Sequence, residues 1–150
     1  MVRAPGVPDD RDNKRRGILG GSGGKGIKPV HDFGVMELDM MVEFLPEFAV
    51  ADSGIVLIDA RSKEHFEETR IPGARLVHHY RQEDTIAEHL PAMKEAGYVV
   101  IYCAGGDCED SIHLATDLVY HHGLEKEVLY IYEGGMEEWE AAGHPVVEGK

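Results

Sequence analysis

Three short runs of almost purely apolar residues most constrain how this 150-residue chain can fold. They are Ile55–Ile58, Tyr98–Tyr102 and Val128–Tyr132, and each has the length of a strand. A strand that is apolar at consecutive positions is buried on both faces, which is typical of parallel sheets. Segments with helical spacing separate the runs, so strands and helices alternate along the chain. We therefore predict an α/β fold with a parallel sheet and helices on both faces.

The segments between these runs predict the other elements. Apolar residues at helical spacing precede a proline, and we expect the first helix to end there: Leu38, Met41, Val42, Leu45, then Pro46. The remaining expectations are a helix from the N-cap Ser62 to about Thr69, a short strand at Leu76-Val77, and helices over 82–96, 109–122 and 136–142.

The N-terminal segment differs in composition from the rest. Six of the ten residues from Gly17 to Gly26 are glycine, and ordering such a stretch costs too much backbone entropy for a packed core. We expect residues 1–28 to be a disordered, basic, glycine-rich arm or linker, and residues 29–150 to be the folded domain. A phosphate-binding loop is the alternative for the glycines. It is disfavoured because no strand precedes them and no Ser or Thr follows Lys25.

Charge is divided unevenly between these two parts. Residues 1–28 hold seven basic and three acidic residues, whereas residues 29–150 hold eight basic and 25 acidic ones. Residues 29–150 are acidic enough to repel nucleic acid and anionic lipid, so we expect neither as a partner of the folded domain. The sequence shows neither an apolar run of membrane-spanning length nor a secretory signal pattern. We expect a cytoplasmic protein.

A cysteine lies where a parallel sheet places its ligands. Cys103 follows the run Tyr98–Tyr102 and opens a glycine-containing loop that leads into the helix over 109–122. Gly105 and Gly106 allow backbone N–H groups to turn inward as an anion nest, and the helix N-terminus adds partial positive charge. Such surroundings lower a thiol pKa and can hold a thiolate or a persulfide anion. The alternative is that Cys103 is a small buried residue at a strand end.

Two further motifs flank this loop. Asp59-Ala60-Arg61, Phe66 and Ile71–Ala74 form the first, and Gly134-Gly135, Trp139 and Gly143–Val146 form the second. With Tyr102-Cys103 between them, this ordered set over residues 35–147 resembles the rhodanese-like domains, a family that includes single-domain sulfurtransferases.

The resemblance implies a fold and an activity. The fold would be a central parallel sheet of about five strands with helices on both faces. The activity would be sulfur transfer without a cofactor, with Cys103 as the catalytic residue that forms a persulfide and passes sulfane sulfur to a thiol or cyanide-like acceptor. Partners would be small sulfur donors and thiol acceptors, including a protein acceptor. The substrate-binding loop would be Ala104, Gly105, Gly106, Asp107 and Cys108.

Acidic residues around the loop depart from the family pattern. Asp107, Glu109 and Asp110 replace the cationic or hydroxyl side chains that often hold thiosulfate. We expect weak activity with this dianion, improving when Asp107 and Glu109 become Asn and Gln. Arg81 is a candidate for the missing pocket cation.

Cys108, at the far end of the loop, is the second departure. It is a candidate resolving thiol that attacks the persulfide or closes a disulfide, because a curled loop can bring two sulfurs together. Equally, it can be a small side chain packed in the first helical turn.

Two other functional classes, and a metal site, are weighed against sulfur transfer. A cysteine phosphatase is disfavoured, because Glu109 stands where that class carries a phosphate-binding arginine. A non-catalytic thiol-redox sensing or binding module that uses the Cys103/Cys108 pair is the main alternative. No metal site is expected, because the adjacent pairs His78-His79 and His121-His122 point their side chains in different directions.

Overall fold

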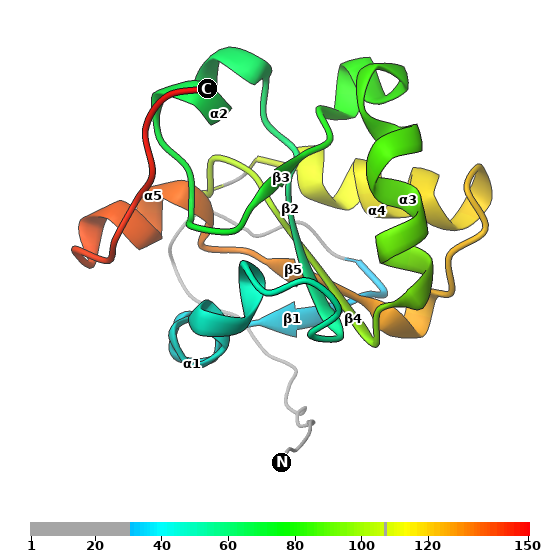
Figure 1. The fold of residues 1–150 in the computed structure, drawn as a ribbon, viewed down its shortest axis with the longest axis horizontal. Helices are drawn as coiled ribbons and strands as arrows, with labels where there is room; N and C mark the ends of the chain where they lie inside the picture. The colour runs from blue at the N-terminus through cyan, green and yellow to red at the C-terminus, as the bar shows by residue number, and fades with distance from the viewer. Residues whose placement is uncertain (1–30, 107) are drawn as a thin grey trace.

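The computed structural model describes residues 31–106 and 108–150, so the predicted arm over residues 1–28 and the loop residue Asp107 lie outside the described residues. Five parallel strands form one sheet in the order β1-β5-β4-β2-β3 (Figure 1). They are β1 (Gly34–Met36), β2 (Ile55–Asp59), β3 (Arg75–Leu76), β4 (Tyr98–Tyr102) and β5 (Leu129–Tyr132). The predicted α/β class and parallel five-stranded sheet are confirmed.

Helices cover both faces of the sheet, also as predicted. The helices are α1 (Leu38–Phe48), α2 (Lys63–Glu68), α3 (Ile86–Glu95), α4 (Asp110–Tyr120) and α5 (Gly135–Ala141), with 3-10 turns η1 (His79–Asp84) and η2 (Lys126–Val128). Figure 1 shows α3 and α4 on one side of the strands and α1 and α5 on the other. None of the helices in the described part of the chain is both long and apolar enough to cross a membrane.

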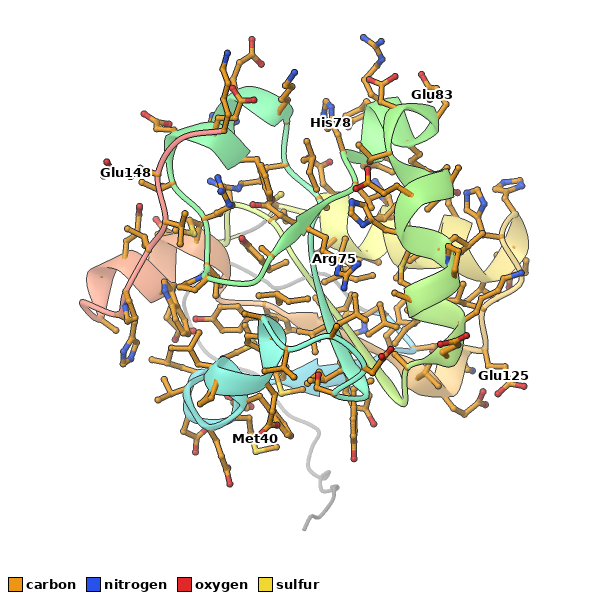
Figure 2. All side chains as sticks on the ribbon, in the orientation of Figure 1. Met40, Arg75, His78, Glu83, Glu125 and Glu148 are labelled. Carbon is orange, nitrogen blue, oxygen red and sulfur yellow. The ribbon has the colours of Figure 1, made fainter. Side chains whose placement is uncertain are left out.

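Alternation along the central strand explains why its sequence is apolar throughout. Val99 and Ile101 of β4 pack into the core under α3 and α4, whereas Val100 and Tyr102 pack into the core under α1 and α5. All four are fully buried. Because both faces are covered, no position of the strand can be polar without a partner. Charged side chains such as Glu83, Glu125 and Glu148 instead extend from the periphery (Figure 2).

Two local predictions differ from the structure, and one strand was not predicted. Helix α1 does not end at Pro46 but continues to Phe48, because a proline in the last turn removes one hydrogen bond while buried Phe48 anchors the turn. The helix predicted over 82–96 begins at Ile86, after the 3-10 turn η1. Strand β1, three residues long with exposed Val35, has no sequence signal of its own.

Candidate active site

The loop between β4 and α4 lies at the carboxyl edge of the sheet, where the sequence places it. Cys103 follows β4 directly and is 3% exposed. Its carbonyl accepts a hydrogen bond from the Met136 backbone N–H at 3.0 Å, and the Ala104 carbonyl accepts one from Glu137 N–H at 2.9 Å. The first turn of α5 therefore holds the loop after β4 in position.

Glycines make this close contact possible. Gly105 and Gly106 have φ of 110° and 63°, and Gly135 at the start of α5 has φ of 63°, all in the left-handed region that favours glycine. A Cβ on Gly135 would lie 2.5 Å from Gly105 N and 2.6 Å from the Cys103 carbonyl oxygen. The glycine pair Gly134-Gly135 thus serves the backbone contact between α5 and the loop.

The loop brings its two thiols together. Both are free, and they lie close enough for each to shift the pKa of the other. Cys103 has a single S–H, which donates to Ser111 Oγ at 3.6 Å. When Cys108 is a thiolate this proton turns to it instead, and that hydrogen bond together with burial raises the pKa of Cys103, whereas the sequence favoured a lowered one. The same hydrogen bond lowers the pKa of the Cys108 thiol to about 6, against its burial and with help from the backbone amides of Asp110 and Ala104. Of the two thiols, Cys108 is therefore the more acidic.

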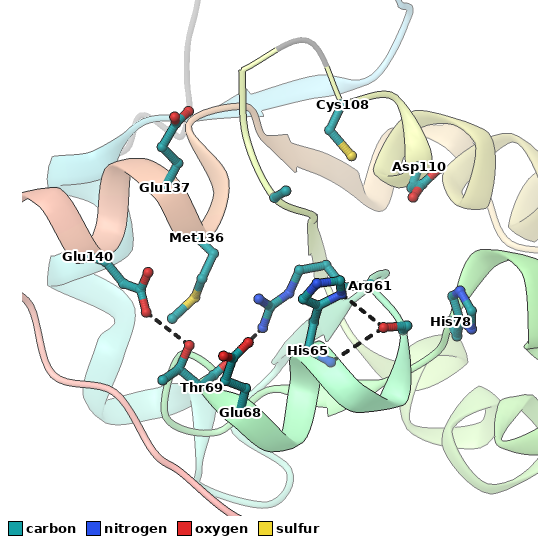
Figure 3. Close-up of a pocket in the computed structure, with 12 residues that line it drawn as sticks. Arg61, His65, Glu68, Thr69, His78, Cys108, Asp110, Met136, Glu137 and Glu140 are labelled. Atoms are coloured by element: carbon teal, nitrogen blue, oxygen red, sulfur yellow. Dashed lines mark hydrogen bonds between the residues drawn. The ribbon is translucent and has the colours of Figure 1, made fainter.

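Charge around the thiols is unbalanced. The pocket beside the loop is lined by the half-buried Cys108 and by four carboxylates: Glu68, Asp110, Glu137 and Glu140 (Figure 3). Arg61 lines the same pocket, but its guanidinium donates to both Asp59 carboxylate oxygens, with Nη2 2.8 Å from Oδ2. The Asp59–Arg61 pair is therefore a structural ion pair whose charge is largely neutralised beneath the pocket.

Arg81 lies elsewhere. Its side chain is 63% exposed on η1 and pairs with Glu83 and Asp84, at 3.4 Å from a carboxylate oxygen of each, and it is not among the described residues that line the pocket. Glu109 is also not among them; its carboxylate lies 3.4 Å from His113 Nε2. The acids that face the pocket come instead from α2, α4 and α5, and sequence reasoning identified only Asp110 of the four.

The effect of Cys103 on the pKa of Cys108 predicts how alkylation of Cys108 depends on pH. We expect iodoacetamide to modify Cys108 at a rate that rises with pH around a midpoint of about 6, because only the thiolate reacts. Cys103→Ala removes the hydrogen-bond donor and should move this midpoint up toward about 8.5. Cys103→Ser keeps a donor and is the matched control, with a lower midpoint than the Ala variant. Peptide mass spectrometry across pH 5–9 measures it. If Cys103→Ala leaves the midpoint at its wild-type value, Cys103 does not lower the pKa of Cys108.

Comparisons with known proteins give a consistent result. The sequence model of the rhodanese-like domain family matches residues 48–142. An HTH-type transcriptional regulator of Mycobacterium tuberculosis is 34% identical over 98 residues, which cover 63% of this chain and 38% of the regulator. This chain therefore spans well under half of the length of that curated relative.

Solved structures show the same fold at lower identity. The BH2092 protein of Bacillus halodurans matches with a TM-score of 0.62, at 21% identity and covering 77% of each chain. A thiosulfate sulfurtransferase of Pseudomonas aeruginosa matches with a TM-score of 0.59 at 22% identity, covering 79% of this chain and 21% of that one. A rhodanese-like domain from Anabaena matches with a TM-score of 0.58 at 18% identity, covering 76% of this chain and 78% of that one.

Proposed function

Because this chain belongs to the family of rhodanese-like domains, we propose that it is a sulfurtransferase or sulfur carrier that holds sulfane sulfur as a persulfide on Cys103. The observation that carries the proposal is the thiol pair at the carboxyl edge of the sheet. Cys103 is the family's loop cysteine by position, and Cys108 is an accessible partner ready to accept its proton. The proposal places the chain in the cytoplasm, where thiols stay reduced.

Loading needs a base, and the Cys108 thiolate can serve as one. As the Cys103 sulfur attacks the sulfane sulfur of a donor such as thiosulfate, its proton passes to Cys108. A Cys103 S–S bond forms, the bond between the two donor sulfurs breaks, and sulfite leaves with the electron pair. The products are the Cys103 persulfide anion, the neutral Cys108 thiol and sulfite, so charge and protons balance.

Unloading reverses the roles. A thiolate or cyanide attacks the outer sulfur of the persulfide, the S–S bond breaks, and Cys103 leaves as a thiolate that recovers its proton from Cys108. While the persulfide exists, the backbone N–H of Ser111 and the N-terminus of the eleven-residue helix α4 stabilise negative charge at Cys103. Small thiols and thiols of a protein acceptor fit this chemistry equally.

The four carboxylates predict which donors are used well. We expect Glu137→Gln/Glu140→Gln to raise kcat/KM for thiosulfate about tenfold at low ionic strength, because a dianion gains from the loss of two nearby negative charges. At 1 M salt the gain should fall to about twofold. Kinetics with thiosulfate and with a less charged organic persulfide measure the difference.

A control double variant tests whether the effect is specific to the pocket carboxylates. Glu125→Gln/Glu127→Gln makes the same change in net charge before β5, at the amino end of that strand, and should leave the rate unchanged. Efficient wild-type turnover of thiosulfate that neither salt nor the pocket variant changes would show that these carboxylates do not select the donor.

A redox switch is the second candidate, favoured by two free thiols that influence each other's pKa and by the similarity to a transcriptional regulator. Intact mass spectrometry separates the two functions. Sulfur transfer predicts the added mass of one sulfur atom after polysulfide treatment, kept in Cys108→Ser and absent in Cys103→Ser. A switch predicts the reversible loss of two hydrogen atoms after peroxide, with no stable gain of sulfur.

A further inference from the structure

A second cluster of reactive side chains lies beside the thiol pocket, between η1 and α4. His79 comes from η1, and Asp110 and His113 lie three residues apart on α4, on one face of that helix. One ligand atom from each lies within 4.8 Å of the other two. We propose that His79, Asp110 and His113 bind a divalent transition-metal ion of the zinc class.

The buried ring nitrogen of His79 is the strongest sign of a missing ligand. Its Nδ1 atom is shielded from solvent and has no hydrogen-bond partner among the described residues. Asp110 Oδ1 lies 4.0 Å away, too far for a hydrogen bond but suitable for an ion placed between the two atoms. A buried polar atom without a partner is rare in native proteins and often marks an unoccupied ion or water position.

The other side of the His79 ring faces a carboxylate. Its Nε2 atom faces Asp117 Oδ2 at 3.6 Å, and Gln82 donates to the same carboxylate oxygen at 2.7 Å. Gln82 also donates to the His79 carbonyl at 3.0 Å. Metal-binding histidines typically offer their second ring nitrogen to a carboxylate, which fixes the ring and raises its basicity. Asp117 is therefore a positioning residue for His79.

The chemistry of the three ligands selects the ion. Two imidazoles and one carboxylate suit zinc, at about 2.0–2.2 Å from the ion, and leave a fourth position for water or a substrate atom. Ligand atoms around such an ion are about 3.3 Å apart, so the site must contract. The His113 side chain is half exposed and can rotate inward to do so.

The ion would sit next to the thiols without depending on them. Asp110 lines the thiol pocket, and its backbone N–H donates to the Cys108 sulfur. A dication there would offset the carboxylates at the pocket mouth. Binding of the ion requires neither thiol, so it can be tested independently of sulfur transfer.

Titration of the full chain with Zn²⁺ tests the site in the Cys103→Ser/Cys108→Ser background, which removes binding by the thiols. Calorimetry should show one equivalent bound, and Co²⁺ should give a visible spectrum without sulfur charge transfer. His79→Gln and His113→Gln should each lower the affinity at least about tenfold, whereas His121→Gln, exposed at the end of α4, should change it less than about twofold.

Asp117→Asn tests the positioning role separately. It should weaken Zn²⁺ binding by about 10- to 100-fold while the stoichiometry and the Co²⁺ spectrum stay those of the parent. His113→Gln keeps the test valid if His79→Gln fails to fold, since His113 is half exposed. Absence of saturable binding below about 100 μM Zn²⁺, or an equal loss in His121→Gln and His113→Gln, would overturn the site.

Discussion

Replacing Cys103 by serine is expected to lower kcat/KM for sulfur transfer by at least about a thousandfold, whichever donor is used. A hydroxyl cannot hold sulfane sulfur, so the covalent route is lost rather than slowed. The fold should survive, because serine can keep the hydrogen bond to Ser111 and removes little volume. We expect a loss of about 1 kcal/mol in the free energy of unfolding for burying the hydroxyl. Steady-state kinetics with polysulfide and thiosulfate, and urea unfolding, measure the two effects.

Cys108→Ser is the matched control for that result. If Cys108 serves as the base, its loss should cost about 10- to 100-fold and shift the pH profile upward, while the persulfide still forms on Cys103. Retention of more than about a tenth of wild-type activity in Cys103→Ser would refute the proposed role. A persulfide that persists in Cys103→Ser and disappears in Cys108→Ser would assign the sulfur to the other thiol.

The strands could be predicted because two-sided burial leaves a strong local signal. Ile55–Asp59 and Tyr98–Tyr102 alternate between two cores, so every position is apolar or internally paired. Strand β1 left no such signal, because it is a short edge strand that pairs only with β5 through Gly34, Val35 and Met36. Its existence depends on tertiary pairing, which no local pattern encodes.

The site was predictable only in part. The place of Cys103 at the end of a buried strand could be predicted, because a strand end followed by glycines is a local pattern. The direction of its pKa shift could not be predicted, since that shift depends on the neighbouring Cys108 and on burial. The pocket acids Glu137 and Glu140 lie more than thirty residues from Cys103 in sequence and reach the pocket through the packing of α5. The cluster of His79 with Asp110 and His113 joins two elements, so comparing adjacent histidines could not reveal it.

The packing of α5 against the loop after β4 leads to the second prediction with a large expected effect. Gly135→Ala is expected to lower the free energy of unfolding by about 3 kcal/mol or more. Roughly 1–2 kcal/mol comes from placing a Cβ at a φ of 63°. The rest comes from overlap, because the new methyl would lie 2.5 Å from Gly105 N and 2.6 Å from Gly105 Cα, both of them backbone atoms that cannot rotate away. The loop must move, and the hydrogen bond from Met136 N–H to the Cys103 carbonyl should break first.

Gly143→Ala separates the two contributions. Gly143 also has a left-handed φ, of 80°, but a Cβ built there meets nothing within 4 Å. It should therefore cost only the backbone strain, about 1–2 kcal/mol, and leave sulfur transfer by the folded protein unchanged. Gly135→Ala should in addition lower kcat/KM per folded molecule, since Cys103 no longer keeps its position. Urea unfolding and kinetics on both variants make the comparison. Equal losses of stability with full activity in both would mean that contact with α5 does not position the reactive loop.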